Sequence, residues 1–225
     1  MNMEINPSEY KILIVDDVMS NVLLLKVLLT NEKFAIATAN NGRQALEQVD
    51  KEHPDLVLLD VMMPDLSGFE VAQRLKSNPD TADIPIIFLT ALNSTTDIVK
   101  GFQAGASDFI SKPFNKEELI IRVTHQVSLV AAKRIILNKT EELQRIIAGR
   151  DKLYSVIAHD LRSPMGSIKM VLNMLMLNLP VEKIGGEMYE LLTMANRTTE
   201  DVFSLLDNLL KWTKSQIGNL NVVYQ

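Results

Sequence analysis

The alternation of short apolar runs with amphipathic stretches over the first 125 residues most restricts what this chain can fold into. The runs are KILIV (11–15), FAIATA (34–39), DLVLLD (55–60), PIIFLT (85–90) and DFISK (108–112). Uninterrupted runs such as ILIV and LVLL are expected for central parallel strands that helices cover on both faces. The intervening segments have the three- and four-residue apolar spacing of such helices. Residues 1–125 are therefore predicted to form an α/β domain, a doubly wound (βα)5 parallel sheet.

The pattern becomes purely helical from about residue 126. Gly149 is the only Gly or Pro between Phe114 and Pro164, and an interrupted heptad repeat runs through this region. We therefore expect one long helix that crosses a linker, 126–150, into a second module, 151–225. Pro180 and Gly185-Gly186 mark a turn before another helix, so this module is predicted to be a helical hairpin. Because two helices alone cannot bury both apolar faces, we expect a homodimer that forms a four-helix bundle through the hairpin.

Composition excludes several classes of function. The chain has 225 residues, a formal net charge of -5 and no cysteine. Scattered Lys and Arg give no footprint for nucleic acid, and thiolate metal sites and thiol catalysis are excluded. No apolar run approaches the length of a membrane span, and the N-terminus lacks the pattern of a signal peptide. We expect a soluble, cytoplasmic chain.

Polar residues gather where the predicted strands end. Asp16 and Asp17 follow the first strand and Asp60 ends the third, so three carboxylates are expected in the crevice where strand order reverses. Their mutual repulsion calls for a cation, and hard oxygen ligands suit Mg²⁺. Thr90 and Lys112 end the fourth and fifth strands. Together these groups predict a site that holds a phosphoryl group while a carboxylate attacks it.

Any one of these acids could simply be solvated at a strand end. That explanation is much weaker for three acids, a threonine and a lysine that all lie at strand ends on the same edge of the sheet. The segments that carry them are VDD (15–17), LLDVMMPDLSGFE (58–70), LTA (89–91) and DFISKPF (108–114). These segments resemble response-regulator receiver domains over nearly the whole first domain. The resemblance implies a flavodoxin-like fold and a place in two-component phosphorelay signalling.

The same resemblance implies a role for each matching residue. Asp60 would be the phosphoacceptor, Asp17 a direct Mg²⁺ ligand and Asp16 an acid that acts mainly through water. The Met62 carbonyl would be a further ligand, and Thr90 and Lys112 would bind the phosphoryl group. The family also implies a cis peptide at Lys112-Pro113 and a switch pair made of Thr90 and Phe109.

One of the three histidines, His159, stands apart from ordinary surface or core histidines. It lies midway between the apolar residues Ile157 and Leu161, roughly 160 to 200° around a helix from them, so it should point outward. An outward imidazole on a rigid helix suits a phosphoryl carrier. Asp160 adjoins it and could orient the ring or accept its proton, and Ser163 shares its face.

The segments SVIAHDLRSPMGSI (155–168) and LLDNLLKWTKSQIG (205–218) resemble the dimerisation and phosphoacceptor domain of histidine kinases. The resemblance implies that His159 is phosphorylated, that Asp160 is the acidic neighbour used in transfer, and that Pro164 bends the helix. Ser163 stands where the family usually has Thr or Asn, a position tied to dephosphorylation of the partner aspartate.

No ATP-binding domain follows residue 225, so we expect a fragment of a longer sensor histidine kinase that does not autophosphorylate as it stands. Its expected partners are that ATP-binding domain or an upstream phosphodonor, with a downstream response regulator as a further candidate. Two other functions compete. A dimeric signalling scaffold with vestigial motifs would neither bind Mg²⁺ nor take up phosphate. A haloacid-dehalogenase-like phosphatase would need a second Asp two residues after the nucleophile, where this chain has Met62.

Overall fold

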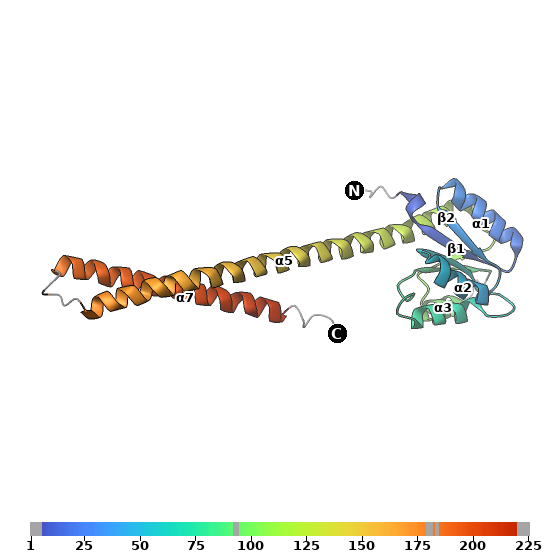
Figure 1. Ribbon diagram of the computed structural model, residues 1–225. Helices are drawn as coiled ribbons and strands as arrows, with labels where there is room; N and C mark the ends of the chain where they lie inside the picture. Colours follow the sequence, from blue (N-terminus) through green and yellow to red (C-terminus); the bar gives the residue numbers. More distant parts are fainter. Residues whose placement is uncertain (1–5, 92–94, 179–181, 183–184, 220–225) are drawn as a thin grey trace. The chain divides into compact units, whose positions relative to one another are not determined.

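A computed structural model describes residues 6–91, 95–178, 182 and 185–219 (Figure 1). The chain divides into two compact units, Met1–Ile136 and Leu137–Gln225. The first unit contains the sheet, and the second contains two helices. None of the helices within the described ranges combines the length and the apolar character needed to cross a membrane.

The first unit is built on one five-stranded parallel sheet, as predicted. The strand order is β2-β1-β3-β4-β5, with β1 hydrogen-bonded to both β2 and β3. β3 and β4 are buried along their whole length, which explains their continuous apolar sequences. The strands are β1 (Lys11–Val15), β2 (Ala35–Ala39), β3 (Leu56–Asp60), β4 (Ile86–Thr90) and β5 (Asp108–Ser111).

Helices pack on both faces of the sheet and form two separate cores. One core holds the buried side chains of α1 and the start of α5, and the other holds those of α2 and α3. The helices are α1 (Met19–Asn31), α2 (Gly42–Glu52), α3 (Gly68–Ser77), α4 (Thr95–Gln103) and α5 (Lys116–Asn178), preceded by a short 3-10 helix, η1 (Pro7–Glu9). The predicted doubly wound arrangement is therefore confirmed.

Local signals fix where the helix next to the third strand begins. Ser67 caps α3 by accepting a hydrogen bond from the Glu70 backbone, and the Glu70 carboxylate accepts one from the Ser67 backbone. This reciprocal capping box satisfies backbone donors that the first helical turn leaves open. The first residue of α3, Gly68, lies so close to β3 that a Cβ atom there would come within 2.2 Å of the Asp60 carbonyl oxygen. Only glycine lets α3 start beside Asp60.

The α5 helix belongs to the core of the first unit well past its first turns. Val127 and Ala131 are both buried in the core shared with α1. Beyond them, Arg134 forms an ion pair of 2.6 Å with Asp55 and lies 5.5 Å from the ring centroid of Tyr10. These contacts hold the helix against the end of the sheet opposite the strand carboxyl ends.

The second unit is a hairpin of helices. α7 (Gly186–Asn219) runs back alongside the last part of α5, and the ion pairs Arg162–Asp207 and Lys169–Glu200 join the two helices (Figure 1). Ala158 and Leu206 are buried between them. The predicted long helix and hairpin are present, and Pro164 lies within α5.

Five apolar residues on the part of α5 that pairs with α7 are not buried against it. Their side chains remain between 38% and 56% exposed, while neighbouring positions such as Ala158 are buried. These exposed residues are Ile157, Leu161, Ile168, Val171 and Leu175. The helix therefore has two faces, one against α7 and one apolar face toward solvent.

Substituting Gly68 by alanine tests the close approach of α3 to β3. The added methyl meets backbone atoms that cannot move aside, so Gly68→Ala is expected to destabilise the first unit by about 2 kcal/mol or more. Differential scanning calorimetry measures the change. Gly149→Ala is the matched control, because a Cβ at that α5 position meets nothing within 4 Å, and it should stabilise its helix by roughly 0.5–1 kcal/mol. Equal effects of the two substitutions would contradict this packing.

Candidate functional site

Three carboxylates converge at the carboxyl ends of two neighbouring strands. Asp16 and Asp17 follow β1, and Asp60 is the last residue of β3, which pairs directly with β1. One oxygen from each carboxylate lies within 4.8 Å of the others. Asp16 is 0% exposed and Asp60 is 3% exposed, whereas Asp17 is open to solvent. The predicted acidic crevice is present, at the point where the strand order reverses.

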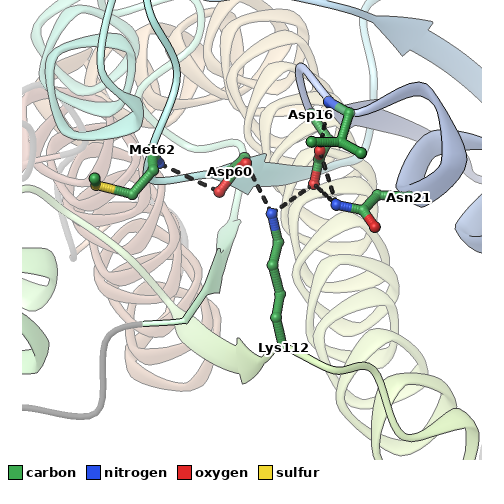
Figure 2. A network of polar contacts seen from close by, with 6 residues as sticks. Asp16, Asn21, Asp60, Met62 and Lys112 are labelled. Carbon is green, nitrogen blue, oxygen red and sulfur yellow. Dashed lines mark hydrogen bonds and ion pairs between the residues drawn. The ribbon is translucent and has the colours of Figure 1, made fainter.

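Lys112 supplies the positive charge inside this cluster. Its ammonium group lies between the Asp16 and Asp60 carboxylates (Figure 2), with the nitrogen 2.8 Å from Asp16 Oδ2 and 2.7 Å from Asp60 Oδ2. The backbone positions the side chain, because Lys112 N–H donates to the Thr90 carbonyl at 2.8 Å just beyond the β4–β5 ladder. The cis peptide expected at Lys112-Pro113 is confirmed.

Asp16 is held by two further donors that sequence reasoning missed. The Asn21 amide donates to both Asp16 oxygens (Figure 2), at 3.0 and 3.1 Å. The Val18 N–H donates to Asp16 Oδ1 at 2.9 Å. Asn21 lies in the first turn of α1, five residues after Asp16. The position of Asn21 directly before the apolar run VLLL (22–25) could have marked it as a candidate, although no sequence signal names Asp16 as its partner.

The loop after β3 also contributes a backbone donor. Met62 N–H donates to Asp60 Oδ1 at 3.2 Å, while the Met62 side chain is exposed. The predicted use of the Met62 carbonyl as a metal ligand stays a prediction. The N–H contact shows that the loop after β3 turns back toward the Asp60 carboxylate.

The electrostatics of the cluster follow from burial and from the shared lysine. Burial raises the pKa of the Asp60 carboxyl, the hydrogen bond from Lys112 opposes this rise, and the charge of Asp16 adds to it. Burial alone would lower the pKa of Lys112, but its hydrogen bonds to Asp16 and Asp60 outweigh burial and raise that pKa. The cluster therefore holds two buried carboxylates around one firmly protonated ammonium group.

The three carboxylates fit a divalent cation by their donor chemistry. Mg²⁺ is bound by hard oxygen ligands, usually one or two carboxylates with water. Asp17 is exposed and could meet the ion from the solvent side, while Asp16 and Asp60 approach from the protein. Mg²⁺ would be held mainly by Asp17 and Asp60, with Asp16 nearby.

Thr90 and Phe109 lie on the two strands next to the cluster. Thr90 ends β4 and is buried, one residue beyond the pairing of Asp60 with Leu89. The Phe109 ring on β5 lies 5.7 Å from the Phe88 ring and 4.9 Å from the Phe102 ring, measured between centroids. Their proposed action as a switch pair remains a prediction.

The second predicted site lies on α5 in the hairpin unit. The His159 side chain is 82% exposed, which confirms its expected outward direction, and its Nδ1 lies 3.3 Å from Asp160 Oδ1. A carboxylate at that distance favours a proton on Nδ1 and leaves Nε2 with the free lone pair. Ser163 is also exposed, one turn further along the helix.

Comparisons with known proteins find relatives of the sheet unit. Residues 12–124 match the response regulator receiver domain. Response regulator PleD of Caulobacter vibrioides is 42% identical over 140 residues, which are 62% of this chain and 30% of PleD. The DNA-binding response regulator MtrA of Mycobacterium leprae is 42% identical over 113 residues, 50% of this chain and 49% of MtrA. The chain thus spans less than half the length of these relatives.

Solved structures give the same result for the fold. The signal receiver domain of a signal transduction histidine kinase from Syntrophus aciditrophicus is 35% identical, with a TM-score of 0.50 over 53% of this chain and 90% of that one. The signal receiver domain of a Luxo repressor protein from Vibrio parahaemolyticus is 29% identical, with a TM-score of 0.54 over 56% and 96%. Both similarities cover about half of this chain.

The raised pKa of Asp60 predicts how stability depends on pH. An acid whose pKa is higher in the folded state than the ordinary 3.8 destabilises the fold as pH rises from about 3.8 through the raised value. Asp60→Asn removes this charge, so the melting temperature should rise by a few degrees at pH 7 and change little near pH 3. Asp50→Asn, at an exposed position of α2, should change little at either pH. A lower melting temperature for Asp60→Asn at pH 7 would contradict the prediction.

Proposed function

The chain belongs to the response regulator receiver domain family, and on this premise we propose that its sheet unit accepts a phosphoryl group on Asp60. Membership of the family places the chain in two-component phosphorelay signalling. The observation that carries the proposal is the grouping of Asp16, Asp17 and Asp60 within 4.8 Å, with Lys112 bonded to two of them. That grouping is what an in-line phosphoryl transfer to a carboxylate needs.

Each residue at the rim of the sheet has a role in this transfer. The Asp60 carboxylate attacks the phosphorus of the donor, whose leaving group departs as the new bond forms. Lys112 and the Thr90 hydroxyl hold the phosphoryl oxygens. Asp16, fixed by Asn21, keeps Lys112 in place beside Asp60. A bound Mg²⁺ would offset the negative charge of the phosphoryl group and the carboxylates.

We also propose that the hairpin unit is the dimerisation and phosphoacceptor domain of a histidine kinase, with His159 as the phosphorylated residue. The support is the resemblance of residues 155–168 and 205–218, together with the exposure of His159 beside Asp160. In this proposal Asp160 orients the imidazole and takes up its proton, and Ser163 supports dephosphorylation. The phosphoryl group on Asp60 either exchanges with His159 or regulates it.

A single helix supports communication between the two proposed phosphorylation sites. α5 contributes Val127 to the core under the sheet and also carries His159. A change in the sheet unit that shifts or twists α5 would therefore reach the histidine directly along the backbone. The proposed partners are an ATP-binding kinase domain or an upstream phosphodonor, and a downstream response regulator. DNA binding, which the name of MtrA states for that protein, is not part of the proposal for this chain.

Incubation with Mg²⁺ and acetyl phosphate tests the receiver role. The phosphorus–oxygen bond to acetate breaks and a new one forms to Asp60, so intact mass should increase by one phosphoryl group. The addition should be alkali-labile, lost in Asp60→Ala and kept in His159→Ala. If the folded protein takes up no phosphoryl group, the alternative of a non-catalytic dimeric scaffold takes the lead.

The exposed apolar face of the hairpin supports the proposed homodimer. α5 exposes Leu161 and Ile168, and α7 exposes Leu191, Leu205 and Trp212. The contact between the two helices includes polar residues, and these large apolar side chains are left on the outside. A second copy would cover these faces in a four-helix bundle, whereas a monomer leaves them in water.

A charge on the exposed apolar face should separate the dimer. Light scattering of the wild-type chain is expected to give twice the 25.3 kDa mass of the chain, and Ile168→Glu should shift it toward 25.3 kDa because a buried glutamate without a partner is unfavourable. Ser167→Glu places the same charge on the preceding residue, on another side of the helix, and should leave the dimer intact. A wild-type monomer at micromolar concentration would exclude this assembly.

A further inference from the structure

Two cations of α5 approach the same aromatic ring of α7. Phe203 lies 6.0 Å from Arg162 Cζ and 5.9 Å from Lys169 Nζ, measured to the ring centroid. Each cation also forms an ion pair with an acid of α7, Arg162 with Asp207 and Lys169 with Glu200. We call these five residues the Phe203 clasp. Each of its two arms combines a cation–π contact to the same ring with an ion pair.

The two arms lie at very different distances from His159. Arg162 follows the histidine by three residues, close to one helical turn. Lys169 follows it by ten residues, roughly 15 Å along the helix axis at 1.5 Å per residue. If the clasp acts on the histidine, only the Arg162 arm should do so, because a contact constrains mainly the turn that carries it.

The His159 side chain does not itself anchor the turn that carries it. The imidazole is 82% exposed, and its polar contact is with its own neighbour, Asp160. Ala158 is fully buried, but its methyl group makes only non-directional contacts. Arg162 adds a directional contact one turn later, since its planar guanidinium meets both the Asp207 carboxylate and the Phe203 ring.

We propose that Arg162, held by Asp207 and Phe203, is a positioning residue for His159. The arm fixes the turn 158–162 against α7 and so sets the direction in which Nε2 of His159 meets a phosphodonor. This role rests on the proposed phosphoacceptor function of His159. The side chains of Arg162 and Asp207 are 43% and 39% exposed, so the pair contributes to orientation more than to stability.

The test uses the whole chain with Asp60→Asn, which removes the competing acceptor, and phosphoramidate as donor. A phosphorus–nitrogen bond forms at Nε2 while that of the reagent breaks and ammonia leaves; the Nδ1 proton passes to Asp160 or water. The rate of acid-labile phosphohistidine formation is read by intact mass. In this background, Asp207→Asn is expected to slow the reaction by about 3- to 10-fold, because the turn that carries His159 loses an orienting contact.

Glu200→Gln is the matched control, because it removes the corresponding acid from the Lys169 arm. It should change the rate by less than about twofold, although both substitutions alter the melting temperature by similar small amounts. The reversed pair Arg162→Asp with Asp207→Arg should recover most of the rate that Arg162→Asp alone loses. Such a rescue separates orientation of the turn from a general loss of stability, and circular dichroism checks that helix content is unchanged.

The other outcomes are separable. If His159 takes up no phosphoryl group in the folded parent, its phosphoacceptor role is excluded and the positioning role with it. If His159 reacts but Asp207→Asn and Glu200→Gln have equal effects, the phosphoacceptor role stands and the positioning role is overturned. If Arg162→Asp slows the reaction while Asp207→Asn does not, Arg162 contacts the phosphoryl group itself, which also overturns the positioning role.

Discussion

The ion pairs of Lys112 with Asp16 and Asp60 are the interaction on which the receiver site depends. Two buried carboxylates on adjacent strands repel each other, and burial without a partner is unfavourable for each. Lys112 meets both at 2.8 and 2.7 Å from the end of β5, so three strands must be in register for the charges to balance. The fold therefore stabilises the site, and the site constrains how the strands align. A cation or a phosphoryl group that enters this crevice changes the charge balance between the two carboxylates and Lys112.

Much of this unit follows from the sequence because its signals are local and repeated. Continuous apolar runs indicate buried parallel strands, and parallel strands bring their carboxyl ends to one edge. The proximity of Asp16, Asp60 and Lys112 could thus be predicted from the sequence. Asn21 could not, because its partnership with Asp16 depends on the angle at which α1 leaves the loop, and no periodic pattern encodes that angle. The individual roles of Asp17, Met62 and Thr90 stay predictions.

The hairpin shows where sequence periodicity reaches its limit. A heptad pattern predicts that one face of α5 is apolar, yet it does not say which surface covers that face. The structure places Ala158 against α7 and leaves Leu161 and Ile168 in solvent. The contact within the hairpin includes the apolar Leu206 as well as small and polar residues, and other large apolar residues remain for the proposed second copy. The sequence pattern predicts the helix and its outward histidine, but it does not predict which face of α5 packs against α7.

The depth to which α5 enters the first core has a consequence for recombining such modules. Val127 and Ala131 are buried beside α1, and Arg134 bonds to Asp55, 79 positions earlier in the chain. A chimaera joined at residue 125, where the composition changes, would replace these side chains with foreign ones and open the core. A junction placed after Arg134 keeps the core of the receiver complete. The choice of junction residue then changes the angle about the helix axis at which the attached module is presented, and not the stability of the receiver.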